Sequence, residues 1–544
     1  MIQGRYVSAV VYGLMLAGLA LPVSGGVARA EVPLFENLGV LHHAITTNSS
    51  LAQNYFDQGL RLVYAFNHEE AIAAFAEASR LDPDAPMPYW GVALSLGPNI
   101  NAAMDSKSEL RAVEAVQKAT GRLAHATPKE RAYVEALAAR YSIKKSATRK
   151  AKDEAYGKAM RRLTHDYPED ADAATLFAEA LMVLRPWDYW RGDGRPQPGT
   201  EDIVTTLESA LHRHPDHPGA CHYYIHAVEA SQEPQRGLPC AKRLPSLMPG
   251  AGHLVHMPAH IYMRMGLYRE ASERNAQAAT VDHEYLLHHP LEGNYASGYY
   301  AHNLHFLNAS LVMEGRSAEA LQAARDLLSK ISVDEIVKEP SLEWYAPTLL
   351  LTMARFGQWG ELIRQPPPPK ELRYTTGLWH YVRGLAFAAT TRFGSAEGEL
   401  SNLRRSLKVL ARAKTAEAKI SRTLLKIAER VLAGELAARR GDFEAGIQAL
   451  REALQLETTV PYSEPPFWFQ PVRHNLGAVL LLAGRASEAE SVYREDLRLN
   501  PENGWALHGL VHSLQAQQKD GAPESARLRT AWAQADVPLT GSRF

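Results

Sequence analysis

Two stretches of this sequence, one near each end, repeat the same spacing of small, aromatic and proline residues. No other feature constrains the fold as strongly. The marked positions are Gly59, Ala71, Phe75, Ala78 and Pro83 in the first stretch, and Gly477, Gly484, Ala489, Tyr493 and Pro501 in the second. Small residues let two short antiparallel helices approach closely, and proline ends the second helix. Because one hairpin cannot bury its own apolar face, the pattern predicts a stack of helical hairpins.

Weaker copies of this unit fill the sequence between the two stretches. Units begin near Pro86, Pro128, Ala173, Cys221, Gly252, Ala301, Glu343, Gly377, Lys426 and Gly504, and the turns between paired helices fall at Gly266, Gly315, Gly357 and Gly441. No run of strands is convincing. The spacing resembles the tetratricopeptide repeat. That resemblance implies an all-α solenoid, a right-handed superhelix of helical hairpins with a concave groove.

Longer motifs resemble a family of large exported bacterial tetratricopeptide proteins. They are YFDQGLRLVYAFNHEEA near the start, PWDYW (Pro186 to Trp190), HYYIHAVEAS (His222 to Ser231) and GHLVHMPAHIY (Gly252 to Tyr262). The resemblance implies the same architecture and adds nothing about chemistry.

The repeats also predict the order of the domains. A lead segment spans residues 31–51, and a first array spans 52–364 with an insert at 282–300. A proline-rich spacer, residues 365–376, holds Pro366 to Pro369, and a second array spans 377–544. A short polyproline run favours a stiff spacer over a ligand for another domain.

Residues 1–30 have the pattern of a secretory signal peptide. Arg5 precedes an apolar run from Val7 to Leu21, and Ala28-Arg29-Ala30 predicts cleavage before Glu31. A retained membrane anchor is the alternative, but the run is short for a span. We expect a soluble periplasmic or extracellular protein with no membrane span after cleavage.

Charge and cysteine content narrow the function further. Lys plus Arg number 59 and Asp plus Glu number 60, which does not favour a nucleic-acid partner.

The two cysteines are Cys221 and Cys240. An oxidising compartment permits a disulfide between them, and two free buried thiols are an equal alternative.

Histidines gather in one part of the chain. Thirteen of the 22 lie between His212 and His305, where an even distribution would place about four. Their spacing matches the faces of three helices, on which residues three, four and seven apart align. The aligned sets are His222, His226 and Glu229, then His253, His256 and His260, then His302 and His305.

The repeat register indicates where these faces point. In tetratricopeptide repeats the first helix of each unit lines the concave groove, and with Gly266 and Gly315 as turns the aligned residues fall at groove positions. We therefore expect three neighbouring helices to direct this set into one hollow. His212, His214 and His217 are expected in a solvated loop around Pro215 and Pro218.

Imidazole nitrogens are preferred ligands of zinc, copper and iron, and a glutamate adds an oxygen ligand. The hypothesis is a transition-metal site formed by His222, His226, Glu229, His253, His256, His260, His302 and His305. Eight candidate residues are more than the four ligands of one tetrahedral site. Some of them would therefore orient other ligands or bind a second ion. A single histidine on a helix is more often structural, and a histidine-rich groove also binds peptide carboxylates without metal.

Three functions follow from this pattern. The first is an exported scaffold whose groove binds a protein or peptide partner and carries the metal. The second is a metal-dependent enzyme with Glu229 as ligand or general base. The third is metal storage or delivery. A deeply buried cluster with an open coordination position would favour catalysis, and an open groove would favour peptide binding.

Overall fold

The structure, a computed structural model, describes residues 32–141, 147–192, 194–288, 295–468 and 470–544. The expected signal peptide, residues 1–30, lies outside the described residues. Leu34–Phe544 forms one compact unit, and all that follows concerns this unit.

The described residues form helices, with one isolated bridge between Trp190 and Pro196 and no strand. In chain order the elements are α1 (Ser50–Tyr64), α2 (His68–Leu81), α3 (Pro86–Ser95), α4 (Ser106–Thr120), η1 (Leu123–His125), α5 (Pro128–Tyr141), α6 (Arg149–Asp166), α7 (Ala171–Val183), α8 (Thr200–Arg213), α9 (Pro218–Val228), η2 (Pro234–Gly237), α10 (Leu238–Leu247), α11 (Gly252–His256), α12 (Pro258–Arg264), α13 (Tyr268–His288), η3 (Ala296–Tyr300), α14 (Ala301–Glu314), α15 (Ser317–Leu328), α16 (Val333–Lys338), η4 (Pro340–Trp344), α17 (Thr348–Arg355), α18 (Trp359–Arg364), α19 (Arg373–Ala389), α20 (Phe393–Leu410), α21 (Ala416–Arg439), α22 (Phe443–Glu457), α23 (Val472–Leu482), α24 (Ala486–Leu499), α25 (Gly504–Ala516) and α26 (Ala522–Ala531). None of these helices is long and apolar enough to cross a bilayer.

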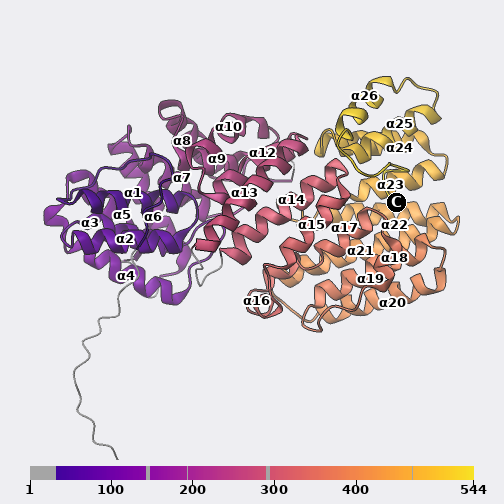
Figure 1. Cartoon of the computed structure of the whole chain (residues 1–544), viewed down its shortest axis with the longest axis horizontal. Coiled ribbons are helices and arrows are strands. Elements are labelled where there is room, and N and C mark those ends of the chain that lie inside the picture. Colours follow the sequence, from indigo (N-terminus) through magenta and orange to yellow (C-terminus); the bar gives the residue numbers. More distant parts are fainter. Residues whose placement is uncertain (1–31, 142–146, 193, 289–294, 469) are drawn as a thin grey trace, which may run out of the picture. The chain divides into compact units, whose positions relative to one another are not determined.

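Consecutive helices pack as hairpins, and the pairs follow one another along the chain (Figure 1). Contacts between glycines and an aromatic ring hold them together. A Cβ atom built on Gly59 would lie 2.6 Å from the ring of Phe75, and one built on Gly91 would lie 2.5 Å from it. Phe75 of α2 therefore fills the space that glycines leave on α1 and α3.

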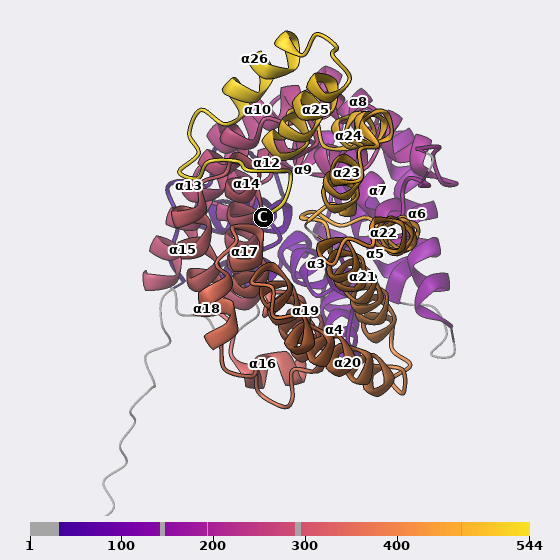
Figure 2. The same cartoon turned by 90° about the vertical axis from the view of Figure 1, so that its right-hand side faces the viewer.

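The same contact recurs near the C-terminus. Tyr493 of α24 lies against Gly477 of α23 and Gly509 of α25, where Cβ atoms would approach its ring to 2.4 and 2.1 Å. Long antiparallel pairs such as α19 with α20 and α21 with α22 precede it (Figure 2). With this packing at both ends, the chain is an all-α, tetratricopeptide-type array of helical hairpins.

Four glycines make the turns that the sequence predicted. Gly266, Gly315, Gly357 and Gly441 have φ values of 74°, 75°, 66° and 88°. This left-handed conformation costs little only for glycine.

Several helices begin where the repeats predicted, including α3, α5, α14 and α25. Others begin earlier because a side chain upstream caps them. α9 starts at Pro218, since His217 accepts the N–H of Ala220, and α21 starts at Ala416, since Thr415 accepts the N–H of Ala418. Within the expected insert, α13 continues to His288.

Candidate metal centre

Helix α9 holds the first group of candidate ligands. His222 and His226 lie one turn apart on it, and Glu229 follows at its C-cap. All three side chains are buried, with at most 2% of each residue exposed. Nδ1 of His222 donates to the carbonyl oxygen of Tyr64 on α1 (2.7 Å), and Nδ1 of His226 donates to Oε1 of Glu229 (2.8 Å).

The second group lies on α11 and α12, which follow each other almost without a break. Pro258 lacks an N–H group and interrupts the helical hydrogen bonds. Met257 nevertheless keeps right-handed helical angles, φ −49° and ψ −35°. The stripe of His253, His256 and His260 therefore survives, and all three are buried.

Helices α9, α11, α12 and α14 bring these residues into two triads. Triad A is His222, His226 and His253, and triad B is His256, His260 and His302; within each, one ring nitrogen per residue lies within 4.8 Å of the others. In triad A the Nε2 atoms of His222 and His253 are 3.1 Å apart. His302 on α14 is half-buried, and its ring centroid is 4.7 Å from that of His256.

Glu229 joins the two triads. Its Oε1 accepts from Nδ1 of His226 in triad A, and its Oε2 accepts from Nδ1 of His260 in triad B (2.6 Å). The hydroxyl of Tyr462 also donates to Oε2 (3.2 Å). Glu229, His226 and His260 are close enough to form a ligand group of their own, but both carboxylate oxygens already accept imidazole protons.

Two rings of triad B are held in a single tautomer. Nδ2 of Asn275 donates to the carbonyl of Ala271 (2.8 Å), so its Oδ1 accepts from Nδ1 of His256 (2.6 Å). Nδ1 of His260 likewise donates to Glu229. Each ring, when neutral, therefore keeps a lone pair on Nε2. These two Nε2 atoms face each other at 2.9 Å.

Burial keeps these imidazoles neutral. It lowers the pKa of His222, His226 and His260 to about 3. Burial and then the neighbouring imidazoles hold the pKa of His253, His256 and His302 well below the ordinary value. A neutral imidazole is the form that binds metal ions.

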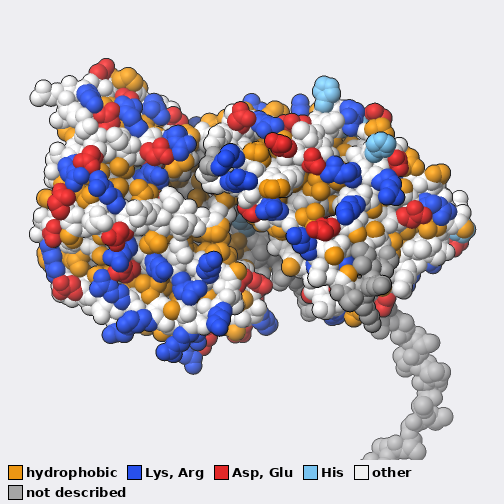
Figure 3. Space-filling model, turned by 180° about the vertical axis from the view of Figure 1, so that it is seen from behind, with side chains coloured by type: hydrophobic (Ala, Val, Ile, Leu, Met, Phe, Trp, Pro, Cys, Tyr) orange, Lys and Arg blue, Asp and Glu red, His pale blue; other side chains and the backbone are white. Residues whose placement is uncertain are grey.

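Aromatic rings enclose the triads. The centroid of Phe66 lies 4.5 Å from that of His222, and the centroid of Trp187, in the PWDYW motif, lies 5.0 Å from that of His226. Both residues have left-handed backbones, with φ of 58° and 63°. Such strain in bulky residues costs about 1–3 kcal/mol and concentrates at functional sites. Few histidine side chains, coloured pale blue, are visible on the face of the molecule shown in Figure 3.

The remaining predicted residues have other surroundings. His305 belongs to no ligand group among the described residues, and its ring packs on Tyr345 at 5.1 Å. His212 and His214 are exposed as expected, although His212 lies in the last turn of α8 and not in the loop. The prediction of a solvated His217 is wrong, because this residue caps α9 and is 5% exposed.

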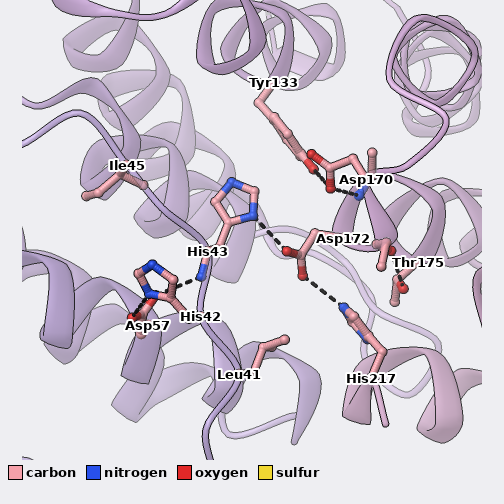
Figure 4. A network of polar contacts seen from close by, with 12 residues as sticks. Leu41, His42, His43, Ile45, Asp57, Tyr133, Asp170, Asp172, Thr175 and His217 are labelled. Carbon is pink, nitrogen blue, oxygen red and sulfur yellow. Dashed lines mark hydrogen bonds and ion pairs between the residues drawn. The ribbon is translucent and has the colours of Figure 1, made fainter. Parts of the chain in front are cut away.

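His217 belongs to a second buried network, shown in Figure 4. Asp172 on α7 accepts from Nε2 of His217 (3.0 Å), Nδ1 of His43 (2.7 Å) and the hydroxyl of Tyr64 (2.7 Å). His43, Asp170 and Asp172 are near enough to hold an ion, yet these three donors already satisfy the Asp172 carboxylate. The network fixes the lead segment against α7 and α9. Sequence spacing gives no sign of it, since His43 and Asp172 are 129 positions apart.

The two cysteines are free and buried. The thiol of Cys240 forms a hydrogen bond with that of Cys221, and this bond, together with burial, raises the pKa of Cys221.

Comparisons with known proteins add little. No family model matches the chain, and no curated protein matches it. Among solved structures, the human IFIT1 dimer with m7Gppp-AAAA is 11% identical over 90% of this chain and 92% of that one, with a TM-score of 0.33. Yeast Tom70 is 13% identical over 89% and 92%, with a TM-score of 0.28, and the P58(IPK) TPR domain is 11% identical over 86% and 98%, with a TM-score of 0.20.

Proposed function

We propose that this chain is a metalloprotein in which the hairpin array encloses a pair of transition-metal ions, one in triad A and one in triad B. The contact between Nε2 of His256 and Nε2 of His260 carries the proposal. Two lone pairs facing each other at 2.9 Å repel, and burial opposes relieving that repulsion by protonating either ring. A metal ion bound by both nitrogens removes the repulsion.

The separations within the triads fit this assignment. Two nitrogens on one tetrahedral zinc ion lie about 3.3 Å apart, given bonds of about 2.0–2.1 Å. The nitrogen–nitrogen distances of 2.9 and 3.1 Å need only small side-chain movements to reach that value. In this proposal Glu229 orients one ligand of each triad, because its carboxylate accepts the Nδ1 protons of His226 and His260. Such a carboxylate–histidine–metal arrangement is common in metal sites.

Three imidazoles leave the fourth position of a tetrahedral ion open, which is typical of catalytic rather than structural sites. The proposed function is therefore a metal-dependent enzyme that uses zinc, copper or iron. Glu229 serves as a positioning residue, because both of its oxygens are engaged. Burial of the histidines disfavours their use in binding a peptide at the surface.

Metal analysis of untagged protein tests the proposal. We expect about two metal ions per chain, falling to about one in His226→Ala or in His260→Ala. The exposed His214→Ala is the matched control. Metal-free protein whose melting temperature does not respond to added zinc, copper or iron would refute the proposal.

A protein or peptide partner is the second candidate function. It is supported by the array itself, since hairpin solenoids present long surfaces to partners. Export is proposed with it, on the basis of residues 1–30. Mass spectrometry of the secreted chain should find Glu31 at its N-terminus, and Ala30→Phe should block cleavage.

A further inference from the structure

A cavity of about 320 Å³ lies beside the candidate metal centre. It is bounded by α12, α13 and α14 on one side and by side chains from residues 457–468 and 471–473 on the other. We call it the α12–α23 cavity. Its volume is at the lower end of the range for small-molecule sites.

Three buried polar atoms on its wall have no hydrogen-bond partner among the described residues. They are the hydroxyl of Tyr268, Nε1 of Trp468 and Oε2 of Glu457. Tyr268 and Trp468 are only 6% and 7% exposed. Buried polar groups are normally satisfied, so three unpaired ones around one cavity indicate an occupant that pairs with them.

The charges on the wall indicate the sign of that occupant. Glu464 forms no ion pair with any described residue. Its Oε1 (2.9 Å) shares the single proton of the Tyr462 hydroxyl with Oε2 of Glu229 (3.2 Å). Oε1 of Glu457 accepts the N–H of Val472 (3.2 Å), and the ion pair that its Oε2 forms with Arg473 is loose, at 3.9 Å. Arg264 is already engaged, since Nε and Nη2 donate to the carbonyls of Glu229 (3.0 Å) and Ser231 (3.4 Å).

We propose that the α12–α23 cavity binds a small organic ammonium compound with an aromatic body and an oxygen that accepts hydrogen bonds. The ammonium group pairs with Glu464 and Glu457. The oxygen accepts from Trp468 and Tyr268, and the ring packs among side chains such as Met263 and Phe467.

Binding of an ammonium group should be coupled to ionisation of the two carboxyls. Burial raises the pKa of Glu457 to about 7 and that of Glu464 to about 8. A cation in the cavity offsets this desolvation and favours the ionised form of both. The proposal does not depend on metal, although the hydroxyl of Tyr462 joins Glu464 to Glu229.

Three probes that share a ring but differ in charge test the proposal: tyramine, the neutral alcohol tyrosol and the anion 4-hydroxyphenylacetate. Titration calorimetry is run on the full chain both metal-loaded and chelated, so that failure of the metal centre and failure of the cavity are distinguished. We expect tyramine to bind one site in both forms, with a dissociation constant of about 1 mM or tighter. Tyrosol should bind at least tenfold more weakly, and the anion should not bind.

Variants complete the test. Glu464→Gln should weaken tyramine binding at least tenfold, while Glu169→Gln, at a side chain 82% exposed, should leave it unchanged. Trp468→Phe keeps an aromatic ring but removes the Nε1 donor, and it should weaken tyramine binding severalfold. This variant gives a second test if Glu464→Gln folds poorly. Tighter binding of the anion, no saturable tyramine binding, or tyramine binding unchanged by both variants would overturn the proposal.

Discussion

The hydroxyl of Tyr462 donates a hydrogen bond to Oε2 of Glu229 across 233 positions of the sequence. The loop between α22 and α23 thus reaches the carboxylate that holds one imidazole of each triad. The surroundings of the candidate metal centre therefore include a segment from far outside the histidine-rich part of the chain.

Replacing Glu229 with glutamine tests its role as a positioning residue. One oxygen cannot accept from both His226 and His260, and the amide nitrogen faces one imidazole N–H. We expect metal affinity to fall by about 10–100-fold, with the metal content at saturation unchanged, as measured by competition with a chelator. Glu233→Gln, at a side chain 66% exposed, is the control. Loss of one ion even at saturation would instead identify Glu229 as a ligand.

His302 and His305 lie one turn apart on α14 and form a matched pair. His302 joins triad B, whereas His305 packs on Tyr345. His302→Ala should reduce the bound metal from about two ions per chain towards one after gel filtration, and His305→Ala should leave two. Equal losses in the two variants would contradict the division into triads.

The pairing of His43 with Asp172 should make stability depend on pH. Burial opposes the charged form of His43, but the hydrogen bond and the charge of Asp172 outweigh it and raise the pKa of His43 above 6.5. The His43–Asp172 ion pair thus contributes fully to the free energy of unfolding below about pH 6.5. This contribution is lost as pH rises through the pKa of His43 in the folded state.

His43→Ala should accordingly destabilise the chain by about 3 kcal/mol at pH 6 and by less at pH 9, in urea unfolding. His42→Ala removes the neighbouring contact between His42 and Asp57. The side chain of His42 is 58% exposed. It should cost no more than about 1 kcal/mol. If His43→Ala destabilised the chain more at pH 9 than at pH 6, the predicted direction of the pH dependence would be wrong.

Glycine packing predicts opposite effects at two helical glycines. A Cβ at Gly91 would meet the Phe75 ring at 2.5 Å, so Gly91→Ala should destabilise the array by about 1–3 kcal/mol. No atom lies within 4 Å of a Cβ at Gly394 on α20. Gly394→Ala should therefore be neutral or stabilise by up to about 1 kcal/mol. Thermal melting measures both, and similar melting temperatures would contradict the packing.

The sequence was sufficient for features that depend on local spacing. The close approach of α1 and α2 and the turn at Gly266 follow from the repeat pattern, and the stripe of His253, His256 and His260 follows from helical periodicity. The stripe persists even though Pro258 divides the helix, because Met257 keeps helical angles.

Features that depend on distant segments could not be predicted. Spacing shows which residues share a helix face, but not what covers that face. The histidines were expected to line the concave groove, and the sequence left open whether they would be buried; rings such as Phe66 and Trp187 cover them. The partners of Asp172 and Glu229 come from remote positions, and no local pattern marks them.

Ligands drawn from α9, α11, α12 and α14 would affect how the whole molecule unfolds. Repeat arrays unravel piecemeal, since each hairpin is stabilised mainly by its two neighbours. Ions gripped by side chains from three successive hairpins would make that stretch melt as a single block, while the ends could fray independently.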